Sequence, residues 1–458
     1  MSLIANLHSS RPLRALALVC GLLCAPLPAL ADQLDDVLVE DADLDALFDL
    51  GPADAAQGQA SAASGLRLSG YGELGAARTY GDDARWSHLR ARLELGASGK
   101  LGNRARWKLV ARGDGDAAFD HEDQYYPAAV RRDQRRDGIV REAWVDFGAG
   151  DWEFRLGRQH IIWGEMVGFF FADVVSARDM RDFLLPELET IRIGQWAARA
   201  EYFGENSHFE LIWVPQPSYD NIGKPGADFY HFPGIPAGTR IKEHKPATSL
   251  SNGNWGARYS QLINGWDLSA FYYRSSDITP TLAFNPQAMA LELRHDRIRQ
   301  FGGTFSKDLG SFVLKGEVVH THGRKLNLHQ PGALGLKASD MVDYAFGVDI
   351  PYGDDWRFNV QYFARWLGSH HRDMLFDREE RGLTFQVVRE LGSTLELELL
   401  AATSINRSDY MIRPKLTWKF APEWRAVAGA DIFHGPSQAM FGRFAEQDRV
   451  YLELRRWF

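Results

Sequence analysis

The sequence predicts an all-β protein: a single transmembrane antiparallel β-barrel of about 18 strands (16–18), with one long loop that folds inward. Three observations predict this fold. Many segments alternate between apolar and charged residues, short turns alternate with long loops along the chain, and the last residue is aromatic, Phe458. The composition agrees, because 12% of the 458 residues are aromatic and 43 residues are glycine, as is common in large barrels.

The N-terminal segment has the pattern of a secretory signal peptide. Arg11 and Arg14 precede the apolar run Ala15–Ala25, and an Ala-Leu-Ala tripeptide at 29–31 provides a cleavage site of the small-x-small type. The apolar run is only about half of the ~20 residues that a membrane-spanning helix needs. We therefore expect residues 1–31 to be removed from the mature protein.

The mature chain is predicted to be acidic and free of thiols. Both cysteines, Cys20 and Cys24, lie in the signal segment, which excludes disulfides, thiolate metal sites and cysteine nucleophiles. Without residues 1–31 the chain has 50 basic and 60 acidic residues, a net charge of −10, which argues against nucleic-acid binding. Residues 32–65 are acidic and then rich in Ala, Gly and Ser. They predict a flexible periplasmic leader, with a partner-binding peptide as the alternative.

After residue 65 the hydrophobic period becomes two. In 86–99, the even positions from 88 to 94 are His, Arg, Arg and Glu, whereas the odd positions from 89 to 95 are Leu, Ala, Leu and Leu. Residues 356–366 alternate in the same way. Because successive side chains of a strand point to opposite faces of its sheet, each such segment has one apolar and one charged face. A soluble sandwich shows the same alternation, so the spacing of the turns is needed to distinguish a sandwich from a membrane barrel.

The turns divide the chain into eighteen predicted strands. They lie at 66–80, 86–99, 104–118, 137–147, 152–162, 190–203, 208–215, 253–263, 266–276, 296–307, 311–323, 340–351, 356–369, 382–390, 394–406, 410–420, 424–434 and 447–458. Every second gap is a short turn such as Asn264-Gly265, and the largest of the other gaps are 163–189 and 216–252. Short turns on one rim and long loops on the other are typical of outer-membrane barrels, with the short turns periplasmic. We take residues 66–458 as the barrel.

The C-terminal strand resembles those of outer-membrane barrels in general. It alternates and ends in Phe458, which we expect the barrel assembly machinery to recognise. Val450, Leu452 and Leu454 suit a face toward lipid. Arg456 departs from the apolar pattern and is expected to extend to the headgroups.

The charged face of such a barrel lines its lumen. The basic residues projected onto this lining are Arg90, Arg92, Arg106, Lys108, Arg112, Arg155, Arg199, Arg299, Lys315, Arg357, Arg365, Arg413, Lys415, Lys419 and Arg425. Projected acids are fewer, Glu317 among them, and a positive field inside a low-dielectric tube would favour anionic solutes. The alternative is that these residues form cross-strand ladders with the acids and brace the wall. The two roles are compatible.

The gap at 163–189 is too long for a simple hairpin, at about 27 residues. It contains three consecutive phenylalanines, which would be a solubility liability in an external loop. We therefore expect the loop to fold inward and constrict the lumen, with Arg178, Asp179, Arg181 and Asp182 paired against the wall. A hydrophobic external lid is the alternative. The predicted constriction residues are Trp163, Glu165, Phe169, Phe170, Phe171, Asp173, Arg178, Asp179, Arg181 and Asp182.

This stretch also resembles a known family. It contains Gly157-Arg158-Gln159, then Trp163-Gly164-Glu165, then Asp173-Val174-Val175-Ser176 and an Arg-Asp-x-Arg turn. These motifs look like those of a poorly characterised Gram-negative outer-membrane porin-like family, a domain of unknown function whose members often occur beside RND/MMPL-type transporters. The resemblance implies a channel in the cell outer membrane and an RND-type transporter as a partner. A more distant likeness, in strand number and Arg-rich lining, is to alginate-export barrels.

The function expected from these features is a channel for small solutes, anionic or amphipathic organic molecules among them. We expect no enzyme activity, catalytic residue, cofactor or metal, since no zinc-protease, phosphate-loop or nucleophile-elbow motif is present. His370-His371 with Asp373 is the one candidate for a divalent-ion site, but two His residues without a set of carboxylates are typical of loop or rim residues. The alternatives are an export barrel for an acidic polysaccharide, a barrel enzyme (lipase or protease), and a secretion component that docks through its leader. The expected partners are outer-membrane lipid, the assembly machinery and the solute.

Overall fold

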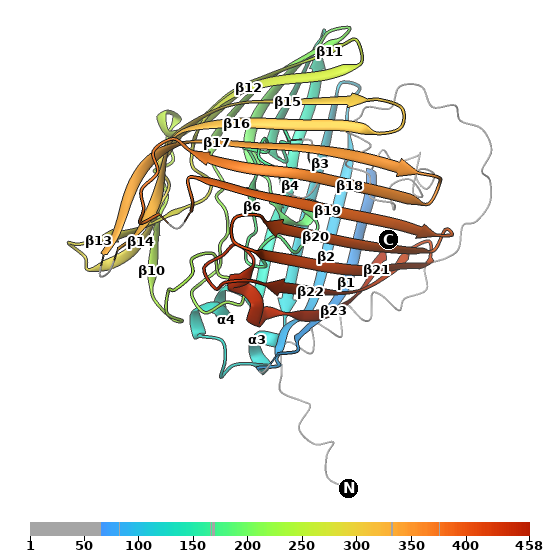
Figure 1. Ribbon diagram of the computed structural model, residues 1–458. Helices are drawn as coiled ribbons and strands as arrows, with labels where there is room; N and C mark the ends of the chain where they lie inside the picture. Colours follow the sequence, from blue (N-terminus) through green and yellow to red (C-terminus); the bar gives the residue numbers. More distant parts are fainter. Residues whose placement is uncertain (1–65, 82, 165, 167–169, 331–332, 375) are drawn as a thin grey trace.

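The computed structural model describes residues 66–458, apart from 82, 165, 167–169, 331–332 and 375. Within this part of the chain, eighteen antiparallel strands form one closed sheet, as Figure 1 shows. The predicted fold and strand number are confirmed. The predicted signal peptide at 1–31 and the leader at 32–65 lie outside the described residues.

The barrel strands follow one another around the cylinder in chain order. They are β1 (Leu66–Thr79), β2 (Trp86–Leu101), β3 (Ala105–Asp116), β4 (Arg136–Ala149), β5 (Trp152–Gln159), β8 (Gln195–Phe203), β9 (Ser207–Gln216), β11 (Asn254–Ile263), β12 (Trp266–Ser276), β15 (Arg297–Asp308), β16 (Val313–Gln330), β17 (Ala333–Tyr352), β18 (Trp356–Leu367), β19 (Glu379–Leu391), β20 (Leu395–Ser404), β21 (Asp409–Ala421), β22 (Trp424–His434) and β23 (Arg449–Trp457).

The barrel closes where β1 pairs with β23. The register runs from Tyr71 opposite Trp457 to Thr79 opposite Arg449. Just after the end of β23, Phe458 forms two backbone hydrogen bonds with Gly70 of β1. Each residue donates one of them, and both are 3.0 Å long. Closure leaves no open sheet edge, which hydrocarbon would not tolerate because unpaired amide and carbonyl groups cost several kcal/mol each there.

The two faces of the sheet differ as the alternation predicts. On β2, Arg92 points inward and is 5% exposed, whereas Leu95 points outward and is 50% exposed. On β1, the inward Glu73 is 1% exposed. Many exposed side chains are therefore apolar and many buried ones are charged, the arrangement of a barrel that meets lipid outside and polar groups inside.

The rims also differ. One rim carries turns of two to four residues, for example Asn264-Gly265, whose φ values of 53° and 74° suit the type I′ turn of a tight hairpin. The other rim carries long loops with small elements of their own. These are α3 (Ala118–His121), α4 (Ala128–Gln134), β6 (Ala177–Arg178), α5 (Leu188–Ile191), β7 (Arg192–Ile193), β10 (Ile241–His244), η1 (Leu250–Asn252), β13 (Thr281–Asn285), β14 (Ala290–Arg294) and η2 (Gly442–Gln447).

Three strand boundaries differ from the prediction by five residues or more. Strands β16 and β17 continue as a hairpin past the expected loop at 324–339, beside β13 and β14 (Figure 1). Ion pairs fix this extension, because Arg324 lies 2.6 Å from Asp277 of the adjacent loop. The predicted strand 190–203 begins only at Gln195, since the residues before it belong to the inward loop. In the described part of the chain, no helix is both long and apolar enough to cross a membrane.

Candidate functional site

The described residues of 160–194, here called the plug loop, leave β5 at His160 and return to the wall at β8. Trp163 anchors the first part of the loop and is 1% exposed. Its indole Nε1 donates a 2.9 Å hydrogen bond to Glu210 Oε2 on β9. Its ring also packs on Phe271 and Tyr273 of β12, with centroid distances of 5.2 and 5.8 Å. The inward face of β9 and β12 therefore holds the start of the loop.

The next part of the plug loop contacts a different side of the barrel. Met166 and Phe170 form a buried cluster with Ala345 of β17 and Phe363 of β18. The backbone N–H of the neighbouring Phe171 donates a hydrogen bond to Glu317 of β16. The loop thus runs from β9 to β18 through the interior of the cylinder.

Side-chain amides and hydroxyls fasten the base of the plug loop. Gln195 Nε2 donates a 2.9 Å hydrogen bond to the carbonyl of Val175, and Ser176 Oγ donates one of 2.9 Å to the carbonyl of Ile161. Asp173 pairs with Arg192 at 2.9 Å. These buried bonds satisfy backbone groups that have no strand partner, which makes the irregular backbone tolerable inside the barrel.

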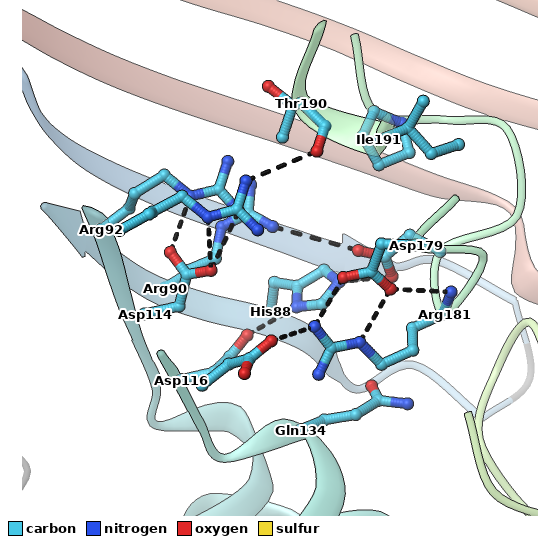
Figure 2. A pocket seen from close by; sticks show the side chains of 14 residues that line it. His88, Arg90, Arg92, Asp114, Asp116, Gln134, Asp179, Arg181, Thr190 and Ile191 are labelled. Atoms are coloured by element: carbon cyan, nitrogen blue, oxygen red, sulfur yellow. Dashed lines mark hydrogen bonds and ion pairs between the residues drawn. The ribbon is translucent and has the colours of Figure 1, made fainter. Parts of the chain in front are cut away.

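A charged cluster joins the second half of the loop to β2. His88 of β2 lies between two carboxylates, 2.5 Å from Asp116 and 2.8 Å from Asp182, and Arg90 is 3.9 Å from Asp182. His88 and Arg181 line a small cavity of about 50 Å³ between the loop and the wall. Figure 2 shows these side chains among those that surround it. Burial alone would raise the pKa of Asp182, but the charges and hydrogen bonds of its neighbours, His88 first, lower it well below the usual range.

The tip of the plug loop extends toward the short-turn rim. Glu187 lies 3.2 Å from Arg425 of β22 and 3.7 Å from Arg455 of β23, and Arg425 is the second residue after the β21–β22 turn. Arg413 of β21 donates a 2.7 Å hydrogen bond to the carbonyl of Leu185. Burial would raise the pKa of Glu187, but the adjacent guanidinium groups lower it.

The predicted inward course of the long loop is confirmed, and Glu165 and Phe169 lie outside the described residues. Trp163, Phe170, Phe171 and Asp173 lie in the lumen as described above. Of the predicted wall pairs, Asp182 binds β2, and Arg181 binds Asp137 of β4 as well as Asp179 at 2.6 Å. The prediction is wrong for Arg178 and Asp179. The Arg178 guanidinium bonds the carbonyl of Asp173 at 3.1 Å and Asp179 pairs with Arg181, because the loop forms a compact hairpin of its own at β6 and β7.

Most residues of the predicted basic lining point inward and are paired with acids of the same wall. The pairs are Arg90 with Glu73, Arg92 and Arg112 with Asp114, Arg106 and Arg155 with Asp146, Lys108 with Glu142, Arg199 with Glu201, Arg357 with Glu390, Arg365 with Asp343, Arg413 with Asp431, and Lys415 with Glu398. Most of these pairs join neighbouring strands, so the contacts are those of the ladder alternative. The lining therefore offers alternating charges rather than an uninterrupted positive surface.

The prediction that Arg299 lines the lumen is wrong. On β15 the neighbouring Ile298 and Gln300 are buried at 3% and 7% exposure, and Gln300 Nε2 donates a hydrogen bond to the buried Thr321. Arg299 is exposed and lies on the opposite face, outside the barrel. Both neighbours of Arg299 occupy the inward positions, so charge alone assigned this residue to the wrong face.

Sequence reasoning missed several residues that hold the plug loop. Glu210 is a buried acid on the inward face of a predicted strand, and strand parity could have found it. Glu317 is one of the acids projected onto the lumen, but its hydrogen bond with the plug loop was not predicted. The aromatic contact of Phe183 with Phe441 and Phe444, at 6.3 and 5.0 Å between ring centroids, could not be predicted. It joins two loops that are far apart in the sequence.

Several side chains with potential catalytic or metal chemistry form structural contacts in the loops. Ser176 and Asp173 hold the loop as described. His371 is 3.6 Å from Asp373, whereas His370 bonds the carbonyl of Phe376 at 3.0 Å. Among the described residues, no group of three His, Cys, Asp or Glu side chains could hold a metal ion.

Comparison with known proteins adds the family. The family described as "Protein of unknown function (DUF1302)" matches residues 13–341. The chain belongs to the DUF1302 family. No curated protein matches it in sequence. The family match agrees with the resemblance seen in the plug-loop motifs, which lie within the matched residues.

Solved structures similar to this DUF1302 protein are outer-membrane barrels. OccAB4 of Acinetobacter baumannii aligns with a TM-score of 0.53 and 9% identity, over 86% of this chain and 98% of that one. OccK8 (OprE) of Pseudomonas aeruginosa aligns with a TM-score of 0.51 and 8% identity, over 86% and 97%. At such low identity the likeness concerns the fold, which is that of an outer-membrane-type barrel.

Proposed function

We propose that this DUF1302 protein is a channel of the Gram-negative outer membrane for small solutes, and that the plug loop controls passage. One observation carries the proposal. The loop contacts β2, β9, β16 and β22, four strands spaced around the closed sheet. A solute that crosses the lumen must therefore pass beside this loop or displace it.

The chemistry of the plug loop supports organic solutes that carry both a negative charge and an apolar part. Guanidinium groups lie against aromatic rings of the loop: Arg178 is 4.6 Å from the Phe170 ring centroid, and Arg365 is 6.0 Å from that of Phe171. Such pairs are held by weak cation–π attraction. A solute with a carboxylate and a ring can replace both partners at once, since its carboxylate binds the guanidinium and its ring packs on the phenylalanine.

Ion selectivity and solute block of the purified barrel test both parts of the proposal. The full-length barrel is reconstituted in planar bilayers, and the reversal potential is measured across a KCl gradient. We expect a steady current with anion preference, which benzoate reduces more strongly than benzyl alcohol at the same concentration. If the folded barrel carries no current, the proposed channel function is wrong. A current with cation preference, or equal block by both compounds, overturns the solute class and leaves the channel in place.

A further inference from the structure

The outer surface of the barrel carries a row of basic residues near the long-loop rim. Strand register places Trp255 of β11 opposite Arg274 of β12, Arg274 opposite Arg299 of β15, and Arg299 opposite His322 of β16. These side chains point outward, because the alternate residues of the same strands point inward to the plug loop or to buried polar groups. Tyr273, for example, packs on Trp163.

The two arginines of this row face each other without an acid between them. Among the described residues, neither Arg274 nor Arg299 forms an ion pair or a side-chain hydrogen bond, whereas His322 lies 2.8 Å from Asp340. Side chains directly opposite on neighbouring strands are only about 5 Å apart at Cβ, and like charges at such positions repel each other. Most lumen cations, by contrast, are paired with carboxylates. The outer pair therefore needs an anion that the described chain does not supply.

Aromatic side chains lie directly next to this pair on the side of the membrane core. Tyr272 is opposite Phe301, with ring centroids 4.7 Å apart, and Trp255 contacts Tyr272 at 5.2 Å. Phe301 is 52% exposed. Aromatic side chains of this kind mark the level of the lipid headgroups in membrane barrels, and the exposed Val318 of β16 continues the apolar surface below them.

The height of Arg274 and Arg299 on the barrel agrees with a position at the level of the lipid headgroups. Arg274 lies eight residues along β12 from Trp266, which follows the short turn. With a rise of about 3.4 Å per residue and a tilt of about 40°, the two residues differ by about 21 Å in height. With Trp266 at the short-turn edge of an apolar band about 25 Å tall, Arg274 and its register partner Arg299 lie within about 4 Å of the long-loop edge, which is the extracellular one in outer-membrane barrels.

We propose that Arg274 and Arg299 bind a phosphate group in the headgroup of an outer-leaflet lipid, whose acyl chains lie along Tyr272, Phe301 and Val318. Two guanidinium groups supply planar pairs of N–H donors that suit phosphate oxygens, and phosphate removes the repulsion between them. The neighbouring aromatic surface favours a lipid over free phosphate. The proposal requires a membrane barrel, and it is independent of whether the lumen conducts.

The test measures lipid binding to the full-length barrel in non-ionic detergent by native mass spectrometry. The probes are bis-phosphorylated lipid A, the same lipid A without its phosphates, and inorganic phosphate as a competitor. The proteins are the wild type, the double variant Arg274→Gln/Arg299→Gln, and the control Arg389→Gln. Arg389 stacks 4.7 Å from the Trp356 ring at the opposite rim, so it is an outward arginine outside the proposed site.

We expect phosphorylated lipid A to bind the wild type and the control equally and the double variant about tenfold more weakly. A heat-dependent gel shift confirms that each variant is folded, and the variant Arg274→Lys/Arg299→Lys should regain part of the affinity. Equal binding of lipid A without phosphates, or unchanged binding by the folded double variant, overturns the site. Displacement of the lipid by equimolar inorganic phosphate also overturns it in favour of a free-anion site.

Discussion

Glu187, at the tip of the plug loop, lies 3.2 Å from Arg425, the second residue after a turn on the short-turn rim. The loop begins at the opposite rim, so this contact shows that it extends through much of the depth of the lumen. Together with the bond between Trp163 and Glu210, it fixes the loop at two separate places on the wall.

Replacing Glu187 by Gln should loosen the tip of the plug loop. The Glu187 side chain is 43% exposed, so solvent screens its pairs with Arg425 and Arg455, and we expect a loss of about 1 kcal/mol. This corresponds to about a fivefold increase in the fraction of time that a single channel spends in its larger-conductance state. Single-channel recording measures it. Glu205→Gln, in an exposed turn, is the matched control, and an equal change in both variants would contradict the attachment.

Trp163→Ala should detach the start of the plug loop while the barrel stays folded. The substitution empties a buried site and leaves Glu210 without its indole donor, a loss of about 3 kcal/mol. We expect faster tryptic cleavage after Arg178 or Arg181 and an unchanged heat-dependent gel shift. The control is Trp213→Ala, which removes an outward tryptophan of β9 that is 39% exposed. Cleavage as slow as in the wild type would show that Trp163 does not anchor the loop.

Acid should release the second half of the loop only at low pH. The folded-state pKa of Asp182 lies below its unfolded value of about 3.9. Its contribution to stability is therefore fully present above that value and is lost as the pH falls through the folded pKa. We expect conductance to be constant between pH 7 and 5 and to rise below about pH 4. Asp182→Asn should show the raised conductance already at pH 7. A rise between pH 7 and 5 in the wild type would contradict the assignment.

Phe458→Ala should reduce assembly of the barrel in the outer membrane. Phe458 closes the seam between β1 and β23 through its backbone bonds to Gly70, and its ring lies beside the same residue. We expect several-fold less heat-modifiable protein in outer-membrane fractions. Phe420→Ala serves for comparison, because Phe420 is an outward aromatic residue of β21 that is 42% exposed. Equal yields of the two variants would show that the last aromatic residue has no special role.

The barrel could be predicted because the patterns that specify it lie within single strands and between strands adjacent in the sequence. The alternation of apolar and polar residues identifies the two faces of each strand. Paired residues such as Arg413 and Asp431 lie on neighbouring strands joined by one turn. The plug loop is different, since its partners come from strands far away in sequence. Its aromatic residues show that it must be buried, and nothing in the local pattern identifies Glu317 or Arg425 as the groups that it meets.

Charge alone also proved an incomplete guide to the lumen. Arg299 has the residue type of a lining residue, yet strand parity places it outside the barrel. The extension of β16 and β17 falls in a gap between predicted strands, and its contacts with the neighbouring loop, such as that of Arg324 with Asp277, join residues that are distant in the sequence.

The conductance of a barrel without its plug tests the central claim most directly. Residues 163–189 are replaced by a short Gly-Ser linker, and single-channel conductance is compared with that of the wild type in the same salt, after the gel shift has shown that both barrels are folded. If the loop obstructs the lumen, the shortened barrel will show a larger and steadier conductance. An unchanged conductance in a folded barrel would contradict the account.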